Sequence, residues 1–187
     1  MKHIAIITCA ELPCLCKDDQ LLLKKLQEYS EEITVSVYIW DRDEIPNGSI
    51  VIVRNTWDYV SKYQNFFEWL NTLPQRNIAV FNDVKTICWN SNKKYLLELE
   101  AKGVPIVPSV LLQMENKSNV NHVFGIMETH EWNVAVVKGC IGAGAYRVMR
   151  ISKQDSSNTA KIKELQGILN EVDVIVQPYF SSIVDKG

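Results

Sequence analysis

Residues 136–149 read VVKGCIGAGAYRVM: an apolar run, a lysine, a loop with three glycines and a second alternating run. A Walker-type phosphate loop has its glycines before the lysine and a helix directly after it, so the position of Lys138 excludes that motif. A dinucleotide-binding G-x-G-x-x-G can be tried on Gly142 and Gly144, but Arg147 occupies its last position and a strand-like run follows. Two interpretations remain: a β-hairpin whose glycine loop closes over phosphates, and a plain hairpin with a solvated lysine. From this stretch alone the plain hairpin is favoured, because short motifs often match by chance.

The composition of the 187-residue chain is that of an ordinary globular protein with one full domain or two small ones. Its 47% hydrophobic and 22% charged residues exclude a disordered or fibrous chain. The net charge of −2 leads us to expect no nucleic acid and no membrane among its partners. The cysteines show no zinc-site spacing, and no run resembles a membrane helix or a signal peptide. We therefore expect a cytoplasmic protein with reduced thiols.

Strand-like and helix-like segments alternate along the first 82 residues. Apolar strand patterns occur at 3–9, at 33–40, in GSIVIVRNTW up to about Arg54, and at 77–82. Helical patterns occur at 20–29, with Asp18 or Asp19 as the cap, and at 61–73, with Tyr63, Phe66, Phe67 and Leu70 on one face. This alternation predicts an open, mostly parallel α/β sheet.

Two polar clusters follow predicted strands of this sheet: TCAELP after the first strand and RNTWDY (54–59) after the third. Ligands of open α/β sheets bind at the carboxyl ends of the strands, so both clusters are candidate ligand contacts. In the second cluster, the candidates are Arg54, Trp57, Asp58 and Tyr59. A purely structural interpretation is equally supported, in which the aromatic residues pack and Arg54 pairs with a nearby carboxylate such as Asp58.

The pattern changes near residue 83. A helix is expected from about Asn92 to Ala101, with Gly103 as its stop signal. The remaining segments are a strand at 107–113, a helix at 119–130, strands at 133–138 and 146–152 joined by 139–145, a helix at 159–172 and a strand at 174–180. The glycine loop therefore lies at the tip of a predicted hairpin.

Three segments in this order resemble the ATP-grasp superfamily: WNSNKKYLLELEAKGVPIVPS (89–109), VVKGCIGAGAYRV (136–148) and VIVQPYF (174–180). The more similar group is the glutathione-synthetase-like one related to the cycloserine-forming ligase, whose preceding domain has a motif that VIVRNTWDY resembles. The resemblance implies an α/β chain with a Rossmann-like pre-ATP-grasp domain at 1–83 and an incomplete α+β ATP-grasp domain at 84–187. In the second domain, 84–110 would be linker and helix, and 111–187 a glycine-loop subdomain.

The resemblance also implies roles for individual residues. Lys93 and Lys138 match the two phosphate-binding lysines, and Gly142 and Gly144 fall in the flexible loop over the phosphates. The adenine hinge would be formed by Gln177, Pro178, Tyr179 and Phe180. The substrate would be faced by Arg54, Trp57, Asp58 and Tyr59. The chain departs from the family pattern at three positions, where aspartate, proline and glutamate are common: Asn92, Gly139 and Gln177.

The implied reaction is the ATP-dependent joining of a small carboxylate to an amine through an acyl phosphate. The cofactors would be ATP and, in the complete enzyme, Mg²⁺, whose ligands lie in a family segment beyond the hinge that this chain lacks. We therefore assign no catalytic and no metal-binding residue, and expect a truncated or naturally short chain that is inactive alone. The alternatives are a non-catalytic nucleotide-binding or interaction module and an α/β regulatory domain without nucleotide. A homodimer is one option for its assembly.

Overall fold

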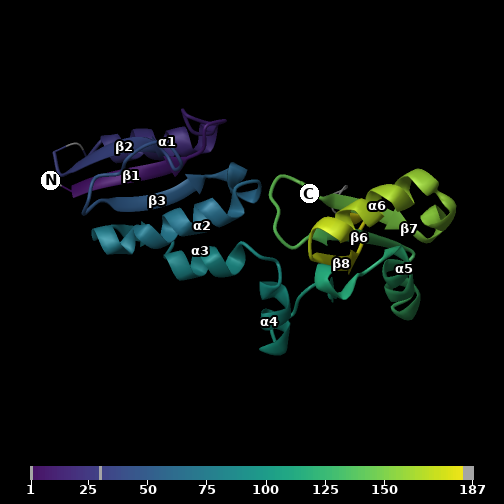
Figure 1. The fold of residues 1–187 in the computed structure, drawn as a ribbon. Coiled ribbons are helices and arrows are strands. Elements are labelled where there is room, and N and C mark those ends of the chain that lie inside the picture. The colour runs from purple at the N-terminus through teal and green to yellow at the C-terminus, as the bar shows by residue number, and fades with distance from the viewer. Residues whose placement is uncertain (1, 30, 183–187) are drawn as a thin grey trace. The chain divides into compact units, whose positions relative to one another are not determined.

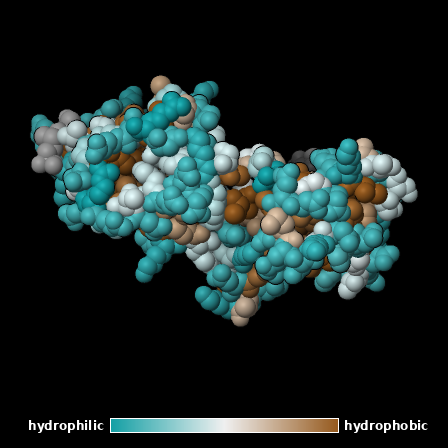
Figure 2. Space-filling model, viewed as in Figure 1, coloured by the Kyte–Doolittle hydropathy of each residue, from teal (hydrophilic) through white to brown (hydrophobic). Residues whose placement is uncertain are grey.

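The computed structural model describes residues 2–29 and 31–182 (Figure 1). The chain forms two compact units, Met1–Trp89 and Asn90–Gly187. Among the described residues, no helix is long and apolar enough to cross a membrane. Figure 2 shows mainly hydrophilic residues on the viewed face, interspersed with smaller hydrophobic areas.

The N-terminal unit is built on a parallel sheet. Its elements are β1 (Lys2–Thr8), α1 (Lys17–Gln27), β2 (Ile33–Ile39), β3 (Ile50–Asn55), a 3-10 helix (Trp57–Val60), α2 (Tyr63–Thr72), a second 3-10 helix (Pro74–Arg76), β4 (Ala79–Phe81) and α3 (Val84–Asn90). The strand order is β2-β1-β3-β4, and all neighbours are parallel. The expected open parallel sheet is therefore confirmed. Because the strand order reverses beside β1, the carboxyl ends of β1 and β3 flank the crevice where such sheets bind ligands.

Aromatic residues form much of the core of this unit. Phe66 and Leu70 of α2 are buried, as the shared helical face predicted, and Phe67 packs against the same cluster. The Trp40 ring meets the Phe66 ring edge to face, with 5.2 Å between the centroids. Figure 1 shows α1 on one side of the sheet and α2 with α3 on the other. Both faces are thus partly covered by helices, as parallel sheets require.

Two predicted helix starts are wrong. Helix α1 has Cys16 at its N-cap rather than Asp18 or Asp19, because the Asp19 carboxylate is buried and accepts hydrogen bonds from Arg54. The helix expected from Asn92 begins at Tyr95. Asn92 itself forms a β-bridge with Ile141, so it pairs as a strand residue and not as part of the helix. Helix α3 was not predicted at all.

The C-terminal unit is built on an antiparallel sheet. Its elements are α4 (Tyr95–Ala101), β5 (Val110–Leu112), a 3-10 helix (Met114–Asn116), α5 (Val120–Thr129), β6 (Val134–Gly139), β7 (Val148–Ser152), a 3-10 helix (Lys153–Ser157), α6 (Thr159–Glu171) and β8 (Val174–Pro178). The strand order is β5-β8-β6-β7. This sheet and its helices confirm the expected α+β class of the second part.

One face of the antiparallel sheet packs against α5 and α6 (Figure 1). Val137 of β6 and Val176 of β8 are paired, fully buried and part of that core. Side chains alternate between the two faces of a strand, so the neighbours Lys138 and Gln177 lie on the opposite face. This second face, away from α5 and α6, is called the site face below.

Asp155 provides a test of pH-dependent stability in the C-terminal unit. Hydrogen bonds from Ser152 and the ion pair with Lys161 lower the pKa of its carboxyl to about 2. A lowered carboxyl pKa stabilises the fold above the unfolded value of about 3.9, and this contribution is lost as the pH falls toward 2. We expect Asp155→Asn to flatten the dependence of the urea midpoint on pH between 5 and 2. The exposed Glu164→Gln serves as the control, and parallel curves for wild type and Asp155→Asn would contradict the prediction.

Candidate functional site

A chain of hydrogen bonds runs across the site face. The Lys138 ammonium donates to Gln177 Oε1 at 2.9 Å, and Gln177 Nε2 donates to Ser109 Oγ at 2.8 Å. A lysine ammonium has only donors, so it fixes which end of the Gln177 amide is the oxygen. Gln177 is only 7% exposed. Lys138 is therefore held by a neutral, well-oriented partner rather than by a carboxylate.

The predicted glycine hairpin is present between β6 and β7, and its loop contacts a second lysine, Lys93. Lys138 pairs with Val148 as the last pair of the β6–β7 ladder before the loop. Inside the loop, the carbonyl oxygen of Gly142 accepts a hydrogen bond from Lys93 Nζ at 3.0 Å. A Cβ at Gly142 would lie 3.0 Å from the carbonyl oxygen of Tyr146, and Gly144 has a φ of +57°. Both glycines therefore suit this loop in a way that other residues do not.

Lys93 and Lys138 come from separate segments and lie close enough to influence each other. The Lys93 amide donates to the Cys140 carbonyl at 2.8 Å, which ties the turn before α4 to the end of β6. Burial lowers the pKa of the Lys93 ammonium, and the positive charge of Lys138 lowers it further, while the Cys140 thiol acts in the opposite direction. Two cations held by neutral acceptors form a site that a polyphosphate anion would stabilise.

The neighbouring Lys94 has a structural role instead. Its ammonium lies 2.6 Å from Asp173 Oδ2, and this contact raises the pKa of Lys94. Asp173 also accepts a hydrogen bond from the Met114 amide at 2.9 Å. Cys140 is buried, and burial raises the pKa of its thiol to about 11, so the thiol stays protonated at neutral pH.

The predicted hinge covers the end of β8 and the two residues after it. Gln177 and Pro178 are the last residues of that strand, and the Tyr179 amide donates to the Val134 carbonyl at 3.0 Å. This amide is therefore already used within the sheet. Phe180 is 44% exposed at the end of the segment.

The structure separates the four candidate substrate residues of the N-terminal unit. Trp57 and Asp58 line a cavity of about 450 Å³ together with Cys9, Glu11, Leu12 and Ser61. This cavity lies at the carboxyl ends of β1 and β3, where a ligand crevice was expected. Arg54 lines a different cavity of about 350 Å³, with residues of β3 and β4. The Tyr59 ring packs on Phe66 at 5.6 Å, so its interpretation as a packing residue is the better one.

Arg54 does not pair with Asp58, as the structural interpretation supposed. Its guanidinium lies 2.7 Å from Asp19 of α1, whose carboxyl pKa is lowered by that contact against the effect of its burial. Asp58 instead accepts hydrogen bonds from Trp40 Nε1 at 2.8 Å and from Lys62 Nζ at 3.0 Å. The two side chains point in different directions: Arg54, the last residue but one of β3, reaches Asp19 of α1, whereas Asp58 lies in the 3-10 helix that follows the strand.

Sequence reasoning marked both polar clusters but missed which of their side chains meet. Ligand atoms of Cys9, Glu11 and Asp58 lie within 4.8 Å of one another. Hydrogen bonds from a backbone amide and from the Cys9 thiol lower the pKa of the Glu11 carboxyl, so it is ionised at neutral pH. These three groups could face one cation, although the Lys62 ammonium already neutralises part of their charge.

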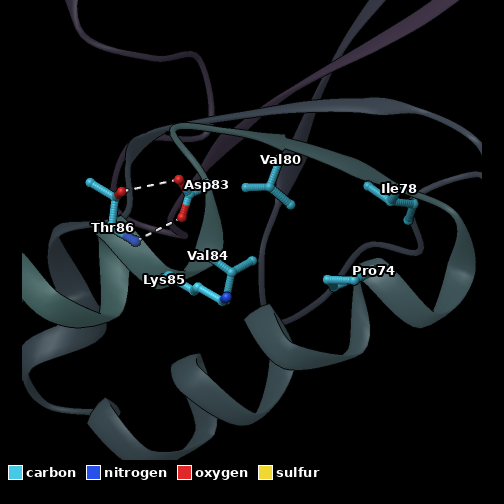
Figure 3. A pocket seen from close by; sticks show the side chains of 7 residues that line it. All are labelled: Pro74, Ile78, Val80, Asp83, Val84, Lys85 and Thr86. Carbon is cyan, nitrogen blue, oxygen red and sulfur yellow. Dashed lines mark hydrogen bonds between the residues drawn. The ribbon is translucent and has the colours of Figure 1, made fainter.

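A further cavity of about 490 Å³ lies beside β4 and the start of α3, in the N-terminal unit (Figure 3). Figure 3 shows Pro74, Ile78 and Val80 along it, with Asp83 at one end. The Asp83 carboxylate accepts hydrogen bonds from the backbone amide and hydroxyl of Thr86. The lining of this cavity is mainly apolar and holds one carboxylate, Asp83, and one lysine, Lys85, so it has no net positive charge to attract a phosphate.

The sequence of this chain is similar to that of a known protein family. Residues 4–82 match the family model of the N-terminal domain of D-cycloserine synthetase DcsG. The cycloserine biosynthesis protein DcsG of Streptomyces lavendulae is 22% identical over 161 residues, which are 83% of this chain and 52% of that protein. The chain thus spans about half the length of the curated relative that it matches.

Solved structures extend the likeness to nearly the whole chain. The crystal structure of D-cycloserine synthetase DcsG has a TM-score of 0.81 at 22% identity, over 97% of this chain and 60% of that one. An ATP-grasp RimK domain protein from Sphaerobacter thermophilus has a TM-score of 0.68 at 13% identity, over 95% and 64%. D-alanyl-alanine synthetase A from Vibrio cholerae has a TM-score of 0.62 at 12% identity, over 96% and 60%. The expected resemblance to the ATP-grasp superfamily is therefore confirmed at the level of the fold.

Proposed function

We propose that this chain is the ATP-binding portion of an ATP-dependent carboxylate–amine ligase. The observation that carries the proposal is that Lys93 and Lys138 both lie at the glycine hairpin, each with a neutral hydrogen-bond acceptor. In a fold shared with ATP-grasp ligases, this arrangement suits the phosphates of ATP, with Gly142 and Gly144 over them. The base would lie toward residues 177–180.

The proposed reaction passes through an acyl phosphate. The terminal phosphoryl group of ATP is transferred to a carboxylate oxygen of the acid, and ADP leaves. The amine then attacks the acyl carbon and expels phosphate. The two lysines would hold the phosphates and offset their charge during the transfer.

Ligases of this kind use Mg²⁺, which prefers carboxylate and other oxygen ligands. The residues described beside the lysine pair do not fit such a metal, because the Asp173 carboxylate is already bound by Lys94 and the Met114 amide. We therefore assign no magnesium ligand and no catalytic residue to them. In this proposal the chain alone is catalytically incomplete.

We propose the cavity at the carboxyl ends of β1 and β3 as the place of the amine substrate. Glu11 supplies an ionised carboxylate, and the exposed Trp57 ring offers a face for a cation. Asp58 lines the same cavity, but its charge is shared with Lys62. Arg54 and Tyr59 have no part in this proposal, since they contact Asp19 and the core.

A second candidate function is a nucleotide-binding module without turnover. It is favoured by the same observation on Asp173, because phosphate-binding lysines without a nearby free carboxylate can bind ATP but transfer little. The coding sequence after Gly187 separates the two candidates. An acidic segment such as D-x-N-x-N would favour the ligase.

Binding of ATP by the chain is the direct test. We expect saturable calorimetric titrations with ATP, ADP and inorganic tripolyphosphate, and weaker binding at higher salt because exposed parts of the site are screened. Candidate acids and amines should add to ATP binding without displacing it. Absence of saturable binding by ATP and by tripolyphosphate would overturn both nucleotide functions.

A further inference from the structure

Arg150 lies on the site face, at a place that sequence reasoning did not mark. It is paired with Val136 across β6–β7, and Val136 is paired with Gln177 across β6–β8. Paired residues of neighbouring strands share a face, so Arg150 and Gln177 lie on either side of Val136. The centre of the Arg150 guanidinium is 4.1 Å from the centroid of the Tyr179 ring.

The site face has two different ends. Lys138 stands beside the glycine loop, whereas the Tyr179 amide binds the Val134 carbonyl four residues earlier on β6. At a rise of about 3.4 Å per residue, the two ends are roughly 14 Å apart. One end carries the lysine pair and the other an aromatic ring with a guanidinium, and Val136 lies between them. A nucleotide also has two chemically different ends, with phosphates at one end and a flat base at the other.

We propose that Arg150 is a positioning residue for the base, and this inference rests on the proposed function. Its guanidinium stacks on the Tyr179 ring and holds the ring in one orientation, so that the base stacks against a prepared surface. The main chain of Tyr179 is already fixed by its hydrogen bond to Val134, which leaves the side-chain torsions as the freedom to be removed. A planar, weakly hydrated guanidinium suits this contact better than an ammonium. Ordering the ring before binding lowers the entropic cost of stacking the base.

Arg147, the other arginine near the loop, has a different position. Its guanidinium lies 2.7 Å from Glu171 and faces the ring of Tyr146, within the hairpin tip. Arg147 is thus neutralised by a carboxylate, whereas the described contact of Arg150 is the Tyr179 ring. The contrast supports a role for Arg150 at the base and not in the loop.

The test compares ligands that have a base with one that has none. We expect Arg150→Met to weaken ATP and ADP binding about fivefold, and to leave binding of inorganic tripolyphosphate within about twofold of wild type. Arg150→Lys should restore part of the loss, because a cation remains over the ring. The exposed Lys153→Met, which removes one charge next to β7, is the control and should bind all three ligands normally.

A double-mutant cycle links the effect to the ring. Tyr179→Ala should weaken ATP binding at least as much as Arg150→Met, and the double variant should lose no more than Tyr179→Ala alone. An equal loss of tripolyphosphate binding, or additive effects of the two substitutions, would overturn the role of Arg150. If wild type binds ATP and Arg150→Met binds it with the same affinity, the role of Arg150 is overturned and the proposed function is not. A wild-type chain that binds neither ATP nor tripolyphosphate would overturn the proposed function with it.

Discussion

Replacement of Lys138 by methionine is expected to weaken ATP binding about 10- to 150-fold, which corresponds to the 1.5–3 kcal/mol of a charge-assisted hydrogen bond. Methionine keeps the length of the side chain and removes its charge. The loss should be as large for tripolyphosphate as for ATP, because the ammonium would act on the phosphates. The substitution also leaves the Gln177 oxygen, on a side chain that is 7% exposed, without its donor. Isothermal calorimetry at one fixed ionic strength measures the change.

The control for Lys138→Met is again Lys153→Met, which changes the net charge equally on an exposed lysine. Its affinity for ATP should stay within about twofold of wild type, because exposed charges more than a Debye length away are screened. Lys138→Arg keeps the charge and should recover part of the affinity. Equal affinities of Lys138→Met and Lys153→Met would mean that Lys138 does not contact the phosphates.

The strands of both sheets could be located in the sequence because a strand depends on the local pattern of apolar residues. Alternation of apolar residues predicted the strands β6 and β7 on either side of the glycine loop. The position of the lysine before the glycines excluded a Walker-type loop, which leads directly into a helix. The convergence of Lys93 on Gly142 could be anticipated only from the family resemblance, because nothing in the spacing of the two residues brings them together. The start of α4 was misplaced for the same reason: the bridge between Asn92 and Ile141 is a long-range contact.

In the cavity lined by Glu11 and Asp58, too, the sequence predicted the location but not the side-chain contacts. The carboxyl ends of parallel strands share one edge, so TCAELP and RNTWDY were both expected at the ligand crevice, and Glu11 and Asp58 line one cavity there. The direction of each side chain was not predictable from that rule. Arg54 is turned toward Asp19 by its place on β3, and an ion pair with the first turn of α1 has no signal in the sequence around residue 54.

Replacement of Lys93 by methionine is expected to weaken ATP and tripolyphosphate binding by a similar 10- to 150-fold or so, and also to loosen the hairpin. The second effect follows because the Lys93 ammonium donates to the carbonyl of Gly142. Hydrogen exchange of the backbone amides between residues 141 and 147 should become faster in Lys93→Met and stay unchanged in Lys153→Met. Unchanged exchange together with unchanged affinity would contradict a role for Lys93 in holding the glycine loop and in binding phosphate.

The two lysines should also be distinguishable by pH. Burial lowers the pKa of Lys93, so this lysine loses its proton below the ordinary lysine value of about 10.4. Phosphates bind the protonated form, so the affinity for tripolyphosphate should fall as the pH rises through the Lys93 pKa. Lys93→Met should lack this alkaline decline. In Lys138→Met the decline should persist but move to higher pH, because the neighbouring positive charge that lowers the Lys93 pKa is gone. Identical alkaline profiles in wild type and Lys93→Met would show that another group binds the phosphate.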